Sequence, residues 1–205
     1  MKKILLILVM FIYSCAGVNP SILNPLNDPL SKKLHKLQIG LGSGSVMRTE
    51  SVKTVTVQTD FATIFSRELE TNVFDNSRKN VGYIEYKIVF DSYNLQPISF
   101  LLYGLHGITA FFPTLLGLPV ESRKRTLEAE ISIYDIEEVQ LKKYIISSTS
   151  DASWVTLYNQ SSAWSPRRKA GVQVTKEIIN QFKSQLLEDI DFLNKELEGQ
   201  NSNSE

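Results

Sequence analysis

The chain has a single cysteine among its 205 residues, so it cannot form an internal disulfide. It has only two histidines, His35 and His106, and they offer no cluster of metal ligands even with the one cysteine. Neither sign of charge predominates, because 22 basic residues balance 22 acidic ones. This balance argues against a general nucleic-acid binder, which needs a clear basic excess. The sequence therefore nominates no metal, no cofactor and no nucleic-acid partner.

Charge is missing altogether between Asp91 and Glu121. Residues 98–119 are the most hydrophobic part of the chain after the leader, and by length alone they could pass for a transmembrane helix. A single crossing, however, would put the two amphipathic strands that flank them on opposite sides of a bilayer. Prolines and glycines, Pro113 among them, also interrupt a continuous helix. We therefore expect a re-entrant or interfacial element, made of two short helical pieces bent near Pro113.

This apolar insert is predicted to contact a membrane or a partner protein. The basic residues that follow it suit anionic lipid headgroups, and His106 is expected to be an interfacial polar group. Two alternatives stay open: the insert occupies a groove of a partner protein, or it folds into the domain's own core and leaves the basic residues in a solvated turn. The predicted contact residues are Phe100, Leu101, Leu102, Tyr103, Phe111, Phe112, Leu115, Leu116, Arg123, Lys124 and Arg125.

The N-terminus has the layout of an export signal. Lys2 and Lys3 precede an apolar run, Ile4–Ile12, that is too short to span a membrane. The run ends at Ile12-Tyr13-Ser14-Cys15, which resembles the lipobox of bacterial lipoproteins: an aliphatic residue three before the cysteine and a small residue one before it. The alternative is an ordinary signal peptide followed by an incidental cysteine.

The lipobox resemblance has consequences for processing and location. It implies that residues 1–14 are a signal peptide, that cleavage precedes Cys15, and that Cys15 carries diacylglyceryl and fatty-acyl chains such as palmitate. Ala16 is not the aspartate that retains some lipoproteins in the inner membrane, so the resemblance favours the outer membrane, with the domain facing the periplasm.

Hydropathy periodicity divides the rest of the chain. Residues 15–35 contain three prolines and no amphipathic period, which predicts an extended tether to one domain over 36–198, and the polar residues 199–205 predict a disordered tail. Strands are expected at 37–46, 52–59, 83–93, 126–134, 143–150 and 153–158, and helices at 60–74 and 172–197.

This order of elements predicts an α+β fold: an antiparallel sheet of about four to five strands with two helices packed on one face, plus the apolar insert between two strands. In element order it is similar to small periplasmic lipoprotein domains of lipopolysaccharide assembly and curli secretion. No spacing indicates a Ser–His–Asp arrangement, so the sequence nominates no catalytic residue and we expect no enzyme. We expect an accessory or assembly subunit of an envelope transport or secretion complex. The alternative is a periplasmic binding module whose insert lines a pocket for an apolar ligand.

Overall fold

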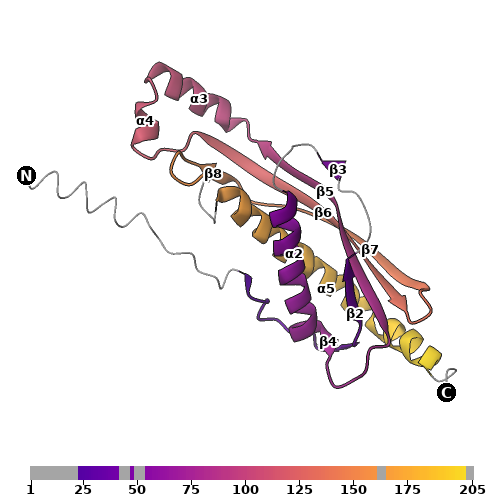
Figure 1. Ribbon diagram of the computed structural model, residues 1–205. Helices are drawn as coiled ribbons and strands as arrows, with labels where there is room; N and C mark the ends of the chain where they lie inside the picture. Colours follow the sequence, from indigo (N-terminus) through magenta and orange to yellow (C-terminus); the bar gives the residue numbers. More distant parts are fainter. Residues whose placement is uncertain (1–22, 42–46, 49–53, 161–164, 202–205) are drawn as a thin grey trace, which may run out of the picture.

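The computed structural model of the chain describes residues 23–41, 47–48, 54–160 and 165–201 (Figure 1). Its elements, in chain order, are β1 (Leu34–His35), β2 (Gln38–Leu41), β3 (Met47–Arg48), α2 (Thr54–Glu68), η2 (Leu69–Val73, a π-helical turn), β4 (Phe74–Asp75), β5 (Gly82–Leu95), α3 (Ile98–Ile108), α4 (Phe112–Leu115), β6 (Glu121–Asp135), β7 (Gln140–Thr149), β8 (Ser153–Val155) and α5 (Pro166–Asn201).

The main sheet has the order β2-β5-β6-β7, with β3 also pairing with β5 and β8 with β6. The long strands β5, β6 and β7 pair with one another in antiparallel fashion, whereas the short strands β2 and β3 run parallel to β5. Strands β1 and β4 form a separate small sheet. The predicted α+β class is confirmed, and the parallel strands at one edge make the main sheet mixed.

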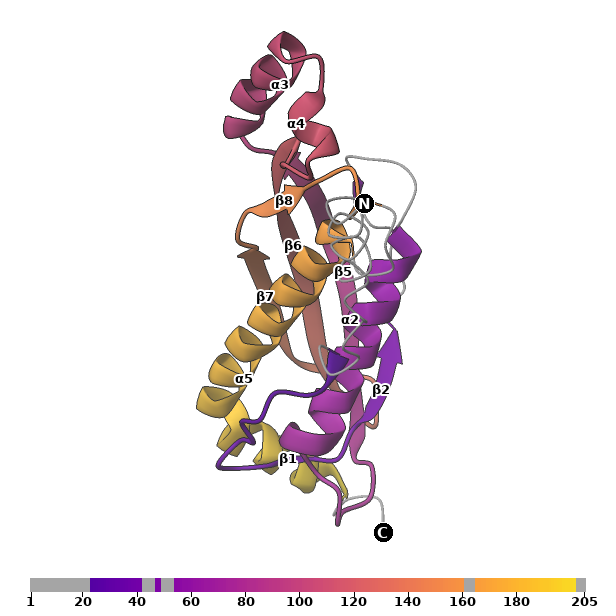
Figure 2. The same ribbon diagram turned by 90° about the vertical axis from the view of Figure 1, so that its left-hand side faces the viewer.

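Helices α2 and α5 cover one face of the main sheet, as Figure 2 shows. The predicted alternation in β5 and β6 accounts for this arrangement, because every second side chain points toward the helices and most of these side chains are apolar. On α5 the predicted apolar stripe is buried against the sheet and α2. The core formed by these elements includes Phe61, Phe65, Ile84, Tyr86, Ile88, Leu127, Ala129, Ile131, Ile133, Tyr144, Ile146, Val174, Ile178, Phe182, Leu186, Ile190, Leu193 and Leu197.

Several predicted boundaries were wrong. Residues 54–59 were predicted as part of a strand because they are rich in valine and threonine, yet they form the first turns of α2. The strand preference of such residues is weak and depends on their surroundings, so it does not prevent a helix here. Helix α5 starts before residue 172, at Pro166, and runs through residues 199–201 of the predicted tail. The rest of that tail and residues 52–53 lie outside the described residues.

The predicted tether, residues 15–35, is in fact packed against the domain from residue 23 onward; residues 15–22 lie outside the description. Leucines at 23, 26 and 30 pack against the core, and Leu34 is fully buried. The prediction of an extended tether relied on the prolines of this segment. It overlooked the leucines, whose apolar side chains are buried when the segment packs on the domain. We call residues 23–35 the N-terminal strap.

A buried charge cluster holds the N-terminal strap in place. The carboxylate of Glu68 accepts hydrogen bonds from the Leu26 backbone N–H at 2.7 Å, from the Asn72 amide at 2.9 Å and from the Lys183 ammonium at 2.8 Å. The Lys183 ammonium also donates to the Asp28 carbonyl. Because both charges are almost fully buried, their mutual pairing and these hydrogen bonds offset the cost of their desolvation.

Candidate functional site

The apolar insert, residues 98–119, forms a helical hairpin that projects beyond the end of the main sheet (Figures 1 and 2). Helix α3 continues from the end of β5, and α4 follows after a turn in which Ala110 and Phe111 take left-handed backbone conformations, with φ of 49° and 62°. The chain then enters β6. The predicted pair of short helical pieces is confirmed, with the bend just before Pro113. We call residues 98–119 the tip.

The tip has its apolar side chains outside and polar side chains inside. Ser99, His106 and Thr114 are at most 7% exposed. The opposite pattern would be expected of a helical hairpin that ends in water, because exposed apolar patches of this size are rare on soluble monomers. The most exposed apolar side chains of the tip, at 61–88%, are Phe100, Leu101, Ile108, Phe111, Phe112, Leu115 and Leu116.

Internal hydrogen bonds hold Ser99 and one ring nitrogen of His106, whereas the buried His106 Nε2 and Thr114 Oγ1 have no hydrogen-bond partner among the described residues. The Ser99 hydroxyl donates to the Ser122 carbonyl at 2.9 Å and accepts the Ser122 backbone N–H at 2.9 Å, which fixes α3 to the first residues of β6. His106 Nδ1 lies 2.9 Å from the Leu102 carbonyl. His106 is therefore not the interfacial group that the sequence suggested, because its side chain turns inward, beside the ring of Phe111.

A second segment, residues 154–158, extends the apolar surface of the tip. Strand β8 pairs with residues 121–123 of β6, and this pairing brings the segment to the base of the tip. The Tyr158 hydroxyl donates to the Leu115 carbonyl at 2.7 Å. Trp154, Leu157 and Tyr158 are each about half exposed. The sequence does not indicate these residues as a site, because their pattern predicts only a strand and the pairing of β8 with β6 is what brings them beside the tip.

The three predicted basic contact residues are not equivalent. They lie within β6, not in a turn, so their side chains alternate between the two faces of the sheet. Arg125 is fully buried and donates to both carboxylate oxygens of Asp91, at 2.9 and 2.6 Å, so its prediction as a headgroup contact was wrong. Arg123 pairs with Glu121 at 2.6 Å, and Lys124 is exposed.

The other predicted contact residues lie on the tip itself. Leu102 is half-buried, whereas Tyr103 is exposed and its hydroxyl donates to the Glu121 carboxylate at 2.5 Å. That carboxylate raises the pKa of the Tyr103 hydroxyl, since it favours the protonated donor. Glu121 thus binds two side chains at once, the hydroxyl of Tyr103 and the guanidinium of Arg123. The base of the tip is therefore a belt of tyrosine, carboxylate and guanidinium groups below an uncharged surface. The predicted lipid site, Cys15, lies outside the described residues.

We also searched the described residues for a membrane-spanning helix, a metal site and an apolar pocket. None of the helices they form is both long and apolar enough to cross a membrane. Within the same ranges, no three histidine, cysteine, aspartate or glutamate side chains come together as metal ligands. A pocket of about 470 Å³ lies between β7 and α5, away from the tip, and its lining is mainly polar. The alternative prediction was that the insert lines a pocket for an apolar ligand. The apolar side chains of the tip are instead exposed at its surface.

Comparison with known proteins finds only distant structural similarity. No family model and no curated protein matches the chain. A solved structure of a minor lipoprotein from Acinetobacter baumannii is similar over 79% of this chain and 92% of its own length, with 10% sequence identity and a TM-score of 0.30. A likeness at this TM-score carries no argument about function, so the proposal below rests on the residues of this chain.

Proposed function

We propose that the chain is a lipid-anchored protein of the bacterial envelope that docks its tip on a bilayer surface. The observation that carries the proposal is the reversed polarity of the tip, with seven large apolar side chains outside and Ser99, His106 and Thr114 inside. This surface is uncharged over its whole length. Exposure of such a surface to water is unfavourable, whereas its transfer to a membrane interface is favourable.

The magnitude of this transfer is large enough for docking. Full burial of a leucine, isoleucine or phenylalanine side chain contributes about 1.5–3 kcal/mol, so partial burial of the seven contributes on the order of 10 kcal/mol before the costs of immobilisation. Even half of that corresponds to a dissociation constant of about 0.1–1 mM. Such an affinity is weak for a protein in solution, yet it is sufficient for a domain already held near the bilayer by an anchor.

The backbone of the tip also suits a bilayer, where unpaired amide and carbonyl groups are costly. Beyond the hydrogen bonds inside α3, the turn between the two helices is closed by the N–H of Thr109 to the Leu105 carbonyl and by the N–H of Phe111 to the His106 carbonyl, at 3.1 and 2.7 Å. At the end of α4, the N–H groups of Leu116 and Leu118, which follow the helix, both donate to the Pro113 carbonyl at 3.1 Å. This internal pairing favours lipid over a protein groove, which would supply hydrogen-bond partners of its own.

Aromatic residues at the base of the tip support the same orientation. Tyr103, Trp154 and Tyr158 each combine an apolar ring with a polar group, as do the side chains that gather at membrane–water interfaces. The ion pair of Glu121 and Arg123 lies next to them. These residues support a lipid interface at this belt, with the tip beyond it in the headgroup and upper acyl region.

The anchor in this proposal is Cys15, on the strength of the lipobox resemblance. Lipid at Cys15 and the apolar tip would give two points of attachment, and the first would raise the local concentration of the second. We further propose that the protein is not an enzyme, lies on the outer membrane facing the periplasm, and serves as an accessory or assembly subunit of an envelope transport or secretion complex, with membrane lipid as its first partner and an integral envelope protein as a candidate second one.

Removal of the tip tests the proposal. Leu95 and Arg123 are paired in register at the ends of β5 and β6, so a short Gly-Ser turn can replace residues 98–119 without separating the strands. In the mature chain from Ala16 onward, which has neither leader nor lipid, this replacement should abolish flotation with phospholipid vesicles while the thermal unfolding transition persists. Undiminished flotation would refute tip docking. Loss of the unfolding transition would show that the tip belongs to the core, and would also refute it.

A further inference from the structure

Strand β7 forms an open edge of the main sheet. It pairs with β6 along one side, and in the described part of the chain no strand pairs with its other side. The strand has ten residues and no proline, so its outward N–H and C=O groups are free to continue the sheet. Lysines often block such edges. Here Lys142 and Lys143 are both near one end of the strand, and each is held in an ion pair, with Asp189 and Glu130 respectively.

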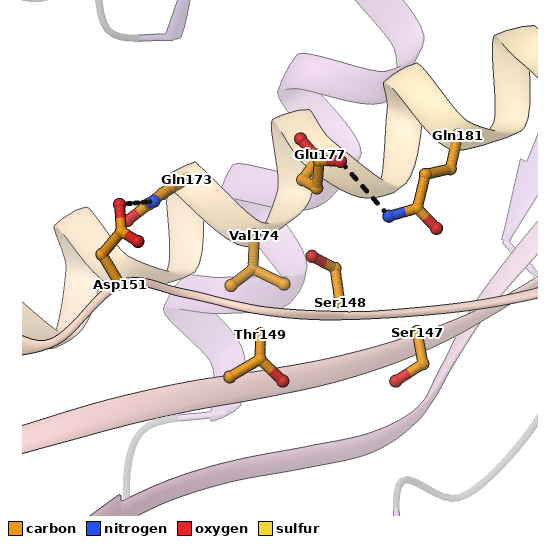
Figure 3. A pocket seen from close by; sticks show the side chains of 8 residues that line it. All are labelled: Ser147, Ser148, Thr149, Asp151, Gln173, Val174, Glu177 and Gln181. Carbon is orange, nitrogen blue, oxygen red and sulfur yellow. Dashed lines mark hydrogen bonds between the residues drawn. The ribbon is translucent and has the colours of Figure 1, made fainter.

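The other end of the β7 edge borders the polar pocket, shown in Figure 3. The pocket has two carboxylates, Asp151 and Glu177, which accept hydrogen bonds from the amides of Gln173 and Gln181, at 2.6 and 3.3 Å respectively. A cation that entered this pocket would therefore meet negative charge. The residues that line it are Ser147, Ser148, Thr149, Asp151, Gln173, Val174, Glu177 and Gln181.

One apolar side chain interrupts the polar outer surface of β7. Ile145 lies at the middle of the strand and is 61% exposed, on the face of the sheet that α2 and α5 leave uncovered. The strand thus has two ion-paired lysines near one end, an exposed isoleucine at its centre and, at its other end, a pocket whose two carboxylates form no ion pair among the described residues. A strand that runs antiparallel to it and has the same pattern would match it at all three places.

We infer that β7 pairs with β7 of a second copy of this chain, antiparallel and with the two Ile145 side chains directly opposite each other. Directly opposed residues in an antiparallel pair share a face of the sheet. In this register Lys143 lies opposite Ser147, and Lys142 lies opposite Ser148. Ser148 lines the acidic pocket, so Lys142 of each copy lies at the pocket of the other, where its ammonium can exchange Asp189 of its own chain for Glu177 of the second copy. The symmetry is that of a twofold dimer, in which one surface is complementary to itself.

The pairing is independent of tip docking and goes beyond it. Because the paired strands run in opposite directions, the two tips lie at opposite ends of the dimer. Neither tip is covered, so a dimer presents an apolar surface at each end and can contact two facing bilayers. A second copy is favoured over an unrelated partner strand because the same twofold register brings the Lys142 of each copy to the carboxylates of the other copy's pocket.

Cross-linking in cells that make the full chain tests the register. One tagged copy carries Lys143→Cys and a differently tagged copy carries Ser147→Cys, and a short bis-maleimide is added. Opposed residues have Cβ atoms about 5 Å apart, so the mixed pair should cross-link. Either variant expressed alone should not, because residue 143 of one copy and residue 143 of the other lie about 14 Å apart along the strands. The chain without substitutions reports any reaction of Cys15.

A third substitution provides the matched control. Ile145→Lys places two like charges opposite each other at the centre of the pair, and it changes an exposed side chain that the fold does not need. In this background the mixed cross-link should fall at least tenfold. Absence of the mixed product, equal products from the single variants, or a product that persists with Ile145→Lys would overturn the inference, and so would cross-links formed only to another protein. Leu101→Asp, which weakens tip docking alone, should leave the cross-link unchanged.

Discussion

A single acidic substitution on the tip should separate membrane docking from folding. Leu101 lies on the outer side of α3 and is 71% exposed. Loss of its partial burial in lipid removes about 1.5 kcal/mol of transfer free energy. Placing a carboxylate in the headgroup region costs on the order of 1–2 kcal/mol more, less than the cost at the bilayer centre. Together these give about 3 kcal/mol, a decrease in vesicle affinity of roughly 100-fold for Leu101→Asp.

The matched control is Ile136→Asp. Ile136 is 60% exposed and lies in the turn after β6, at the end of the sheet opposite to the tip (Figure 1). This substitution has the same chemistry at nearly the same exposure, and it should leave the vesicle affinity unchanged. Neither substitution should change the free energy of unfolding by more than about 0.5 kcal/mol, because both side chains are at the surface.

The assay is a vesicle flotation titration of the unlipidated mature chain, run beside urea unfolding of each variant. A loss of affinity below threefold for Leu101→Asp, or an equal loss for Ile136→Asp, would refute the assignment of the tip as the docking surface. A decrease in unfolding free energy above about 2 kcal/mol for Leu101→Asp would show that the side chain packs in the protein, since a change of that size requires a buried contact.

Three further outcomes are expected. Cys15→Ala should move the protein from the membrane to the soluble periplasmic fraction, and continued membrane retention without acyl labelling would contradict the anchor. Asp91→Asn leaves the buried Arg125 guanidinium without its carboxylate and should lower the unfolding free energy by about 3–5 kcal/mol, measured by urea unfolding. The hydrogen bond from Arg78 lowers the pKa of the Glu198 carboxyl below its ordinary 4.5. Its stabilising contribution is therefore full above pH 4.5 and is lost as the pH falls through the lower folded pKa, so the stability difference between the unaltered chain and Glu198→Gln should vanish in acid.

Most of the framework of the fold was predictable from periodicity. The alternation in residues 83–93 and 126–134 predicts two strands with one apolar face, and the stripe from residue 172 to 197 predicts a helix against that face; all three are confirmed. These signals are reliable because burial requires one face of each element to be apolar. The absence of charge between Asp91 and Glu121 also located the tip.

Other features depend on contacts between distant residues, which local patterns do not encode. Arg125 belongs to a basic run in the sequence, but the alternation along β6 turns it inward to meet Asp91. Trp154 joins the apolar surface only because β8 pairs with the start of β6. The N-terminal strap is fixed by Glu68 and Lys183, two charged residues on different helices whose burial no hydropathy pattern indicates.

The proposal that the tip enters a bilayer is tested most directly by an environment-sensitive fluorophore at its most exposed residue. Ile108 is 88% exposed, and Ile108→Cys in the lipidated chain offers one free thiol, since acylation blocks that of Cys15. After reconstitution into vesicles, the emission of the fluorophore should shift to the blue and become quenched by lipids that carry a quencher in the upper acyl region. The same label on Ile136→Cys should stay in water. An unshifted, unquenched signal from residue 108 in membrane-bound protein would contradict the account.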